Sequence, residues 1–249
     1  MDAKMIAFLI SLGITALVVG PLAKTLRKHA VVFYIVSFVL SGLYMWALFA
    51  GVNPGVWRPI FVIMQKGYLA VLLLGVVMFT GCFDEGTPFR KHFQPIRGEL
   101  SILSFIFFLG HIITYLPSYL PRFASLMSSK PNVAFSLIIA IILTIIFLAL
   151  GITSFKTIRK LMNTHAWKTL QRFSYLMMAL LALHIGFVLG RSAFVGGITL
   201  ATISFFAYEI VLVVYAVLRI RKALRDRERA AELAASNSDK GNGVAGAAA

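Results

Sequence analysis

The sequence predicts an all-α fold, a polytopic integral membrane bundle of about seven transmembrane helices, and three observations carry that prediction. First, 59% of the 249 residues are hydrophobic and only 13% are charged. Second, the mean hydropathy is +0.88, a value outside the range of soluble globular proteins and typical of membrane proteins. Third, apolar stretches of about 20 residues, the length that crosses a bilayer, fill nearly all of the chain before Arg219.

Seven stretches have this length and composition, and we expect each to form one helix across the membrane. They are residues 5–23, 31–50, 60–80, 99–116, 133–152, 168–190 and 195–218. The first stretch has the length of a signal-peptide core. However, Lys24, Arg27 and Lys28 follow it where a cleavage site would need small residues, so we expect this helix to be retained.

The basic residues predict the orientation, because Lys and Arg near helix ends stay on the cytoplasmic side. With the N-terminus outside and the C-terminus inside, 18 of the 24 basic residues fall on the cytoplasmic side. The tail, residues 219–249, is expected to be basic and then disordered, since its end is too small and polar to bury a core. Its basic part would contact anionic lipids of the cell membrane, which accounts for the net charge of +15 without a nucleic-acid partner.

Two histidines, His111 and His184, lie deep inside apolar stretches, where ionisable residues usually serve a function. Imidazole is the usual axial ligand of haem iron, and two rings across one porphyrin make a low-spin electron carrier. Both helices run outward in this topology, and both histidines lie roughly 20 Å above the inner edge at 1.5 Å per residue. We therefore expect them to face each other. The simpler interpretation, that each one hydrogen-bonds a neighbouring helix, stays open.

The lone cysteine bears on the type of haem. Cys82 cannot form an internal disulfide and lacks the CxxCH spacing of covalent attachment. Any haem would therefore be b-type, held by the fold.

Two segments around these histidines resemble landmarks of the ferric reductase-like transmembrane family. They are residues 96–115 (IRGELSILSFIFFLGHIITY) and 153–184 (TSFKTIRKLMNTHAWKTLQRFSYLMMALLALH). The family includes ferric reductases, NADPH oxidases and the haem membrane subunit of the bacterial periplasmic methionine sulfoxide reductase system. The resemblance covers residues 60–218 and implies a six-helix haem-binding core, with residues 1–59 as additional N-terminal transmembrane helices and residues 219–249 as the tail.

The chain departs from the two-haem members of that family in an informative way. Those members carry a further histidine 13 or 14 positions before each ligand, where this chain has Gln171 and Arg97. The resemblance therefore implies one outer haem b, with His111 and His184 as the metal ligands, and an inner site that is absent or ligated differently.

Three alternatives for the inner side stay open. His92 and His165 are the spare imidazoles there, and each could be a ligand or a solvated loop residue. The space beside Arg97, Gln171 and Arg172 could instead hold a flavin (FMN) or a quinone. Basic and amide groups at a helix entrance suit an anionic or carbonyl-bearing cofactor.

Two charged residues inside the predicted helices each have two interpretations. Lys66 would neutralise a haem propionate, or its side chain would extend outward to the membrane surface. Glu209 would accept protons from a quinol, or it would pair with Arg172 as a structural tie.

Together these features predict a b-type haem subunit that passes electrons across the membrane to iron or to an extracytoplasmic reductase partner. It would be the membrane component of an oxidoreductase. No GxGxxG motif follows a strand, so quinol or a separate flavoprotein would donate the electrons. The alternative from another class is a proton-coupled small-solute permease that uses the buried histidines and Glu209. A haem sensor or assembly factor is a third possibility.

Overall fold

The computed structural model describes residues 3–195 and 200–246, and every regular element in these ranges is a helix. The α-helices are α1 (Ala3–Val19), α2 (Ala23–Lys28), α3 (Ala30–Phe49), α4 (Arg58–Lys66), α5 (Tyr68–Thr80), α6 (Pro88–Phe93), α7 (Arg97–Tyr119), α8 (Phe123–Ser129), α9 (Pro131–Ile152), α10 (Lys156–Lys160), α11 (Thr164–Val195) and α12 (Leu200–Gly246). The 3₁₀ turns are η1 (Gly55–Trp57), η2 (Gln94–Ile96) and η3 (Leu120–Arg122).

The described helices confirm an all-α, multi-pass membrane bundle. Five of them are long and apolar enough to cross a membrane, and six crossings result if the bent pair α4 and α5 is one span. The helix α1 is apolar but shorter, with 17 residues, so its crossing of the membrane stays a prediction. The seventh predicted stretch, 195–218, corresponds to the first part of α12, and its residues 196–199 lie outside the described ranges.

The predicted helix 60–80 is broken, which corrects the expectation of one continuous span. The chain bends by 45° between α4 and α5. Gly67, at the bend, has a φ of +66°, a left-handed conformation that glycine adopts without the steric cost a side chain would bring. The break leaves the last carbonyl groups of α4 without partners inside the helix.

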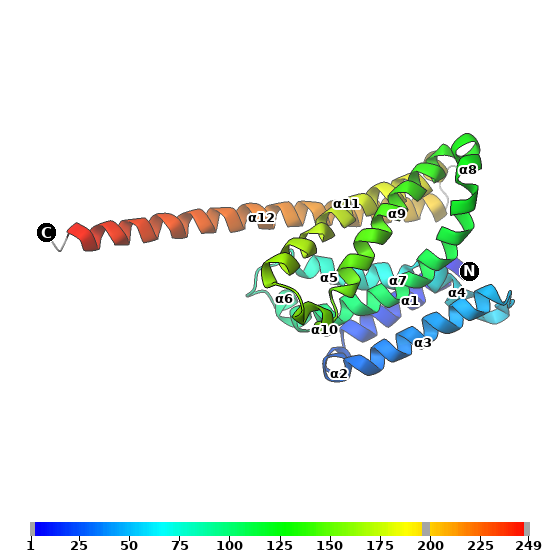
Figure 1. Ribbon diagram of the computed structural model, residues 1–249, viewed down its shortest axis with the longest axis horizontal. Helices are drawn as coiled ribbons and strands as arrows, with labels where there is room; N and C mark the ends of the chain where they lie inside the picture. The colour runs from blue at the N-terminus through cyan, green and yellow to red at the C-terminus, as the bar shows by residue number, and fades with distance from the viewer. Residues whose placement is uncertain (1–2, 196–199, 247–249) are drawn as a thin grey trace.

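Four basic segments of the predicted cytoplasmic side, residues 24–28, 90–97, 156–172 and the tail from 219, gather at one end of the bundle (Figure 1). Figure 1 shows α2, α6, α10 and the long end of α12 on one side, with α4, α8 and the N-terminus on the other. Contacts between segments distant in sequence agree with this view: the His92 ring nitrogen Nε2 lies 2.8 Å from the Val19 oxygen, and the rings of Tyr34 and Phe155 are 6.3 Å apart. Which membrane face this end occupies stays a prediction.

Helices α5 and α7 lie at the centre, because both contribute to the two hydrophobic clusters of the core. One cluster joins them to α1, α2, α3 and α4, and the other joins them to α9, α11 and α12. Inside a membrane, close packing and hydrogen bonds between helices hold such a bundle together. Ser104 Oγ donates to the Ala70 oxygen over 2.8 Å, and the hydroxyls of Tyr44 and Thr114 are 2.6 Å apart.

The contact between α7 and α9 is especially tight at Gly151. A Cβ atom placed on Gly151 would lie 2.1 Å from Cδ2 of Phe105. The aromatic ring therefore packs directly on the glycine backbone, and no other residue type fits there without displacement.

The tail differs from its prediction. The sequence predicts disorder after the basic cluster, but α12 continues as one helix to Gly246. Alanine-rich sequence has high helix propensity, and it extends a helix already nucleated in the membrane at little further cost. The basic part of this helix is also tied to the α5–α6 loop, where Asp84 carboxylate oxygens lie 3.1 Å from Lys222, 3.7 Å from Arg225 and 3.3 Å from Arg229.

Candidate functional site

His111 lies on α7, and its ring reaches the break in the third span. Its Nδ1 atom is 2.8 Å from the main-chain oxygen of Gln65, in the last turn of α4. A carbonyl oxygen only accepts, so Nδ1 carries the proton and donates it. The rings of Phe108 and Tyr115 lie 5.3 and 4.9 Å from the imidazole, measured between ring centres, and they shape an aromatic environment around it.

His184 lies on α11, and α9 positions its ring through one residue. Its Nδ1 atom is 2.9 Å from Ser136 Oγ and 3.2 Å from the Ser136 main-chain oxygen. Ser136 is almost completely buried, with 2% of its surface exposed. The carbonyl oxygen again favours the tautomer with the proton on Nδ1, while the Ser136 hydroxyl can donate to the His184 oxygen over 3.5 Å.

The two imidazoles therefore present the same chemistry. Within the described part of the chain, Nε2 of neither His111 nor His184 has a hydrogen-bond partner. The two rings are also near enough for an electrostatic interaction between them. Histidines that bind metals usually donate Nδ1–H to a carbonyl group and leave Nε2 free to bind, because the first bond fixes tautomer and orientation.

This donor set fits haem better than a bare metal ion. Among the described residues there is no group of three or more His, Cys, Asp or Glu side chains that could hold an ion. Haem needs only two protein ligands, since the porphyrin supplies the other four. The rings of Phe108 and Tyr115 beside His111 suit a hydrophobic macrocycle. When bound, haem would supply reversible one-electron chemistry at its iron.

Lys66 belongs to the surroundings of His111. Its ammonium donates to the hydroxyl of Tyr115 over 2.8 Å and lies 5.4 Å from the centre of that ring. The hydrogen bond draws Lys66 towards α7. The pairing of Lys66 with a haem propionate stays a prediction.

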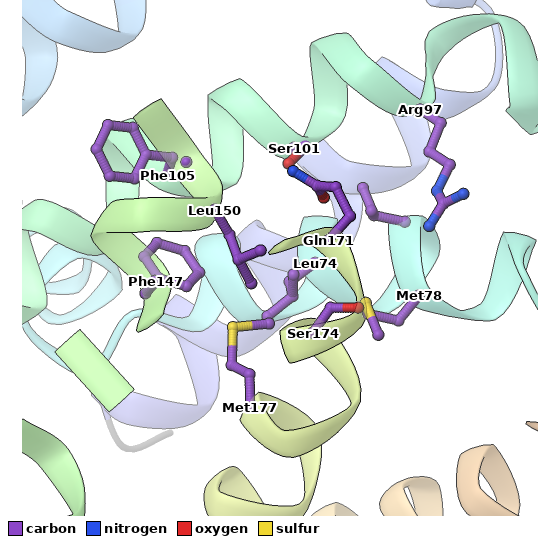
Figure 2. Close-up of a pocket in the computed structure, with 12 residues that line it drawn as sticks. Leu74, Met78, Arg97, Ser101, Phe105, Phe147, Leu150, Gln171, Ser174 and Met177 are labelled. Carbon is purple, nitrogen blue, oxygen red and sulfur yellow. The ribbon is translucent and has the colours of Figure 1, made fainter. Parts of the chain in front are cut away.

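Arg97 and Gln171, at the positions of the missing histidines, line one cavity between α5, α7, α9 and α11 (Figure 2). About 40 Å³ of it is open to water, room for two or three molecules. Gln171 donates to Thr153 Oγ1 over 3.4 Å, whereas Arg97 forms no hydrogen bond or ion pair with another described residue. Arg172 is exposed and does not line this cavity. A flavin or quinone would fit only after the lining side chains move apart.

The other polar candidates are separate from the haem-ligand pair. His92 is exposed and contacts the end of α1, and His165 is exposed at the start of α11. No ion pair joins Glu209 to Arg172 among the described residues. Instead Glu209 Oε1 would lie 3.9 Å from a Cβ placed on Gly186, two residues after His184.

Sequence analysis missed the groups that orient the histidines. The Gln65 oxygen belongs to the main chain, and its availability depends on the bend at Gly67. Ser136 lies 48 residues before His184, and serine is common in membrane helices. The pairing of α9 with α11 would have been needed to single it out.

The chain is similar to an uncharacterized protein of Treponema pallidum (strain Nichols). The two are 29% identical over 231 residues, which cover 90% of this chain and 63% of that protein. The chain thus spans less than two thirds of the length of the relative it matches. No family model and no solved structure matches the chain.

Proposed function

We propose that this chain is a b-type haem subunit that carries electrons across the membrane, to iron or to an extracytoplasmic reductase partner. The observation that carries the proposal is the hydrogen-bonding pattern that His111 and His184 have in common. Both donate Nδ1–H to a main-chain oxygen and keep Nε2 free, which is how proteins prepare imidazole for a metal. Quinol or a separate flavoprotein would be the electron donor.

The residues around the pair have complementary tasks in this proposal. Gln65 and Ser136 hold the two rings from separate helices, α4 and α9, so that ring orientation does not depend on haem. The aromatic rings of Phe108 and Tyr115 exclude water, and Lys66 supplies positive charge on the same side. A rigid, dry pair of ligands changes little between oxidation states, which favours rapid electron transfer.

The inner cavity supports one haem per chain. Arg97 and Gln171 replace the second pair of ligands, and their cavity has room for water molecules only. Neither guanidinium nor carboxamide is a usual haem ligand. An exposed His92 or His165 would have to move into the bundle to ligate a second haem.

A permease remains the competing function, because Glu209 on α12 lies against α11, the helix that carries His184. Ionisable groups on two packed membrane helices would also suit a proton path. The two functions predict different colours for the purified protein. A haem protein is red and shows a sharp Soret band, whereas a permease is colourless.

The test is a visible spectrum of the protein purified in detergent, with haem quantified as the pyridine haemochrome against protein mass. We expect a red protein with one haem per chain. A colourless protein from haem-replete cells would contradict the proposal in favour of the permease, and a ratio near two would contradict the single site.

A further inference from the structure

Arg219 lies where the apolar part of α12 ends, and it has no acidic partner. Its Nη1 atom donates to the Gly81 oxygen over 2.9 Å, and its Nη2 atom donates to the hydroxyl of Tyr175, whose ring centre is 4.7 Å from the guanidinium carbon. No carboxylate pairs with Arg219 among the described residues. A guanidinium carries five N–H groups, and these contacts occupy two of them. Arg219 therefore holds a positive charge and unused donors in a fixed position.

Arg97 adds a second positive charge close to the same glycine. Its Nη2 atom would lie 3.9 Å from a Cβ placed on Gly81, the residue whose oxygen accepts from Arg219. The two guanidinium groups are near enough for an electrostatic interaction between them, and no carboxylate pairs with Arg97 in the described part of the chain either. Like charges at short range repel each other, and an anion beside them reduces that repulsion. The local field therefore favours a negatively charged ligand.

A cavity between α11 and α12 begins at Arg219 and continues into the membrane-spanning part of both helices. It has a volume of about 290 Å³, close to the lower limit of small-molecule sites. Arg219 and Tyr175 line one end, and beyond them the walls are mostly apolar, with Ala179 and Ala216 on the two helices. Both alanines are exposed on the outer surface of the bundle. The cavity is therefore accessible from the surrounding lipid.

The wall of this cavity contains a buried hydroxyl without a partner. Tyr215 lines the cavity and is only 4% exposed, and its hydroxyl forms no hydrogen bond within the described residues. Tyr215 precedes Arg219 by four residues, about one turn of α12, so both side chains lie on one face of the helix. Leaving a buried hydroxyl unpaired is costly. A ligand oxygen held by Arg219 would accept from it and remove that cost.

Charge and shape together indicate an amphiphile with an anionic headgroup. Guanidinium and phenol groups supply the donors that phosphate oxygens accept. Arg219 follows the apolar stretch 195–218, and Arg97 begins α7, so both charges lie at the level where a bilayer has its headgroups. The alanine-lined part of the cavity lies further into the bilayer, at the level of acyl chains. A soluble anion would use the charges but would not contact the apolar part.

We propose that this cavity binds one anionic phospholipid, whose phosphate is held by Arg219, Tyr175 and Tyr215 and whose acyl chain lies between α11 and α12. Such a site differs from the contact of the basic tail with anionic lipids, which depends on charge alone. Glu209 also lines the cavity, but it precedes Arg219 by ten residues, almost three turns of α12, and therefore lies at the acyl-chain end. Binding does not require haem, so this inference goes beyond the proposed function and is independent of it.

The test is titration of the full chain in detergent with phosphatidylglycerol and with phosphatidylcholine of the same acyl chains, measured by native mass spectrometry. We expect one saturable site that prefers phosphatidylglycerol about fivefold or more, since only this lipid carries a net negative charge. Arg219→Gln and Tyr215→Phe should each weaken its binding about fivefold or more, because each removes a hydrogen bond to a charged oxygen. Arg221→Gln removes the same charge at an exposed position outside the cavity lining and should bind like the wild type.

The ligand-free melting temperatures show that each variant folds, and Tyr215→Phe keeps the shape of the side chain. Wild-type affinity in Arg219→Gln or Tyr215→Phe would overturn the inference, as would equal affinity of the wild type for the two lipids. A loss in Arg221→Gln as large as in Arg219→Gln would assign the binding to surface charge and also overturn it.

Two further outcomes separate the possible ligands and the two proposals. Inorganic phosphate that binds through Arg219 and Tyr215, in a protein without a preference for phosphatidylglycerol, would assign the site to a soluble anion and overturn the lipid site. A colourless wild type that binds phosphatidylglycerol as expected contradicts the haem proposal alone. A red wild type that does not bind it contradicts the lipid site alone.

Discussion

The Nδ1 atom of His111 lies 2.8 Å from the main-chain oxygen of Gln65, and the break in the third span makes that contact available. In an unbroken helix the Gln65 oxygen would accept from the amide four residues later. Because α4 ends at Lys66, the oxygen is free to accept from the imidazole instead. A bend in one helix thus fixes the tautomer of a side chain on another.

This relationship predicts the effect of changing Gly67. In Gly67→Ala the new Cβ would lie 3.5 Å from Cβ of His111, an ordinary contact, but the φ of +66° would strain an alanine. The cost is about 1–2 kcal/mol. We expect a lower melting temperature and weaker haem retention. Gly75→Ala is the matched control, since Gly75 lies in the regular helix α5 with nothing within 4 Å of a new Cβ. If Gly67→Ala behaved like Gly75→Ala, the bend would not matter.

Ser136→Ala tests how His184 is oriented. The substitution removes the hydroxyl 2.9 Å from Nδ1 but keeps the main-chain oxygen at 3.2 Å. Loss of a group that orients a metal ligand typically reduces metal affinity about 10-fold to 100-fold. We expect haem to dissociate faster and the reduction midpoint potential to shift, in a protein of nearly unchanged melting temperature. Thr144→Ala, on the same helix with its hydroxyl bonded within α9, should leave both haem measurements unchanged.

Gly151→Ala tests the packing of α7 against α9. The new methyl group would lie 2.1 Å from the Phe105 ring, so one helix must move or the ring must rotate. Overpacking of this kind costs about 1–3 kcal/mol, and a lower melting temperature should result. Gly42→Ala, where a Cβ meets nothing within 4 Å, should be neutral. If the ring causes the conflict, Gly151→Ala should lower the melting temperature less in a Phe105→Ala background than in the wild type, and equal losses in both backgrounds would contradict it.

The ion pairs of Asp84, which lie in a loop outside the membrane-spanning helices, predict that the melting temperature depends on pH. Its pKa is held below the usual value of about 3.9, first by the hydrogen bond from Lys222 and also by Arg225 and Arg229. A carboxylate with a lowered pKa in the folded state stabilises the fold above its ordinary pKa, and it loses this contribution as the pH falls through the lowered value. The melting temperature of wild type should exceed that of Asp84→Asn at pH 7. The difference should shrink as the pH falls through the lowered pKa of Asp84, and it should also shrink in high salt. A difference independent of pH would contradict the ionic tie.

The sequence was sufficient for the features that depend on composition. Hydropathy alone located the apolar helices, and the basic clusters predicted correctly which segments share one end of the bundle. The spacing of Arg97 and Gln171 from the histidines placed both at the same level, and the structure brings them to one cavity.

The remaining features depend on contacts between helices, which periodicity does not reveal. The bend at Gly67 follows from a backbone conformation, and glycine is also common in unbroken membrane helices. The contact between Ser136 and His184 depends on how α9 packs against α11. The helical tail was missed because a composition that cannot form a core was taken to exclude a helix, whereas alanine-rich sequence extends one readily.

The most direct test of the central claim is a comparison of four histidine variants by visible absorption and electron paramagnetic resonance. Two of the variants remove the candidate ligands, His111→Ala and His184→Ala. The other two replace exposed histidines, His29→Ala and His165→Ala. Two imidazole ligands make haem iron low-spin, so the account predicts a low-spin spectrum in wild type and in the two exposed variants. It predicts that the spectrum disappears and haem content falls in both ligand variants. A well-expressed His184→Ala protein with a full, unshifted low-spin spectrum would contradict the account.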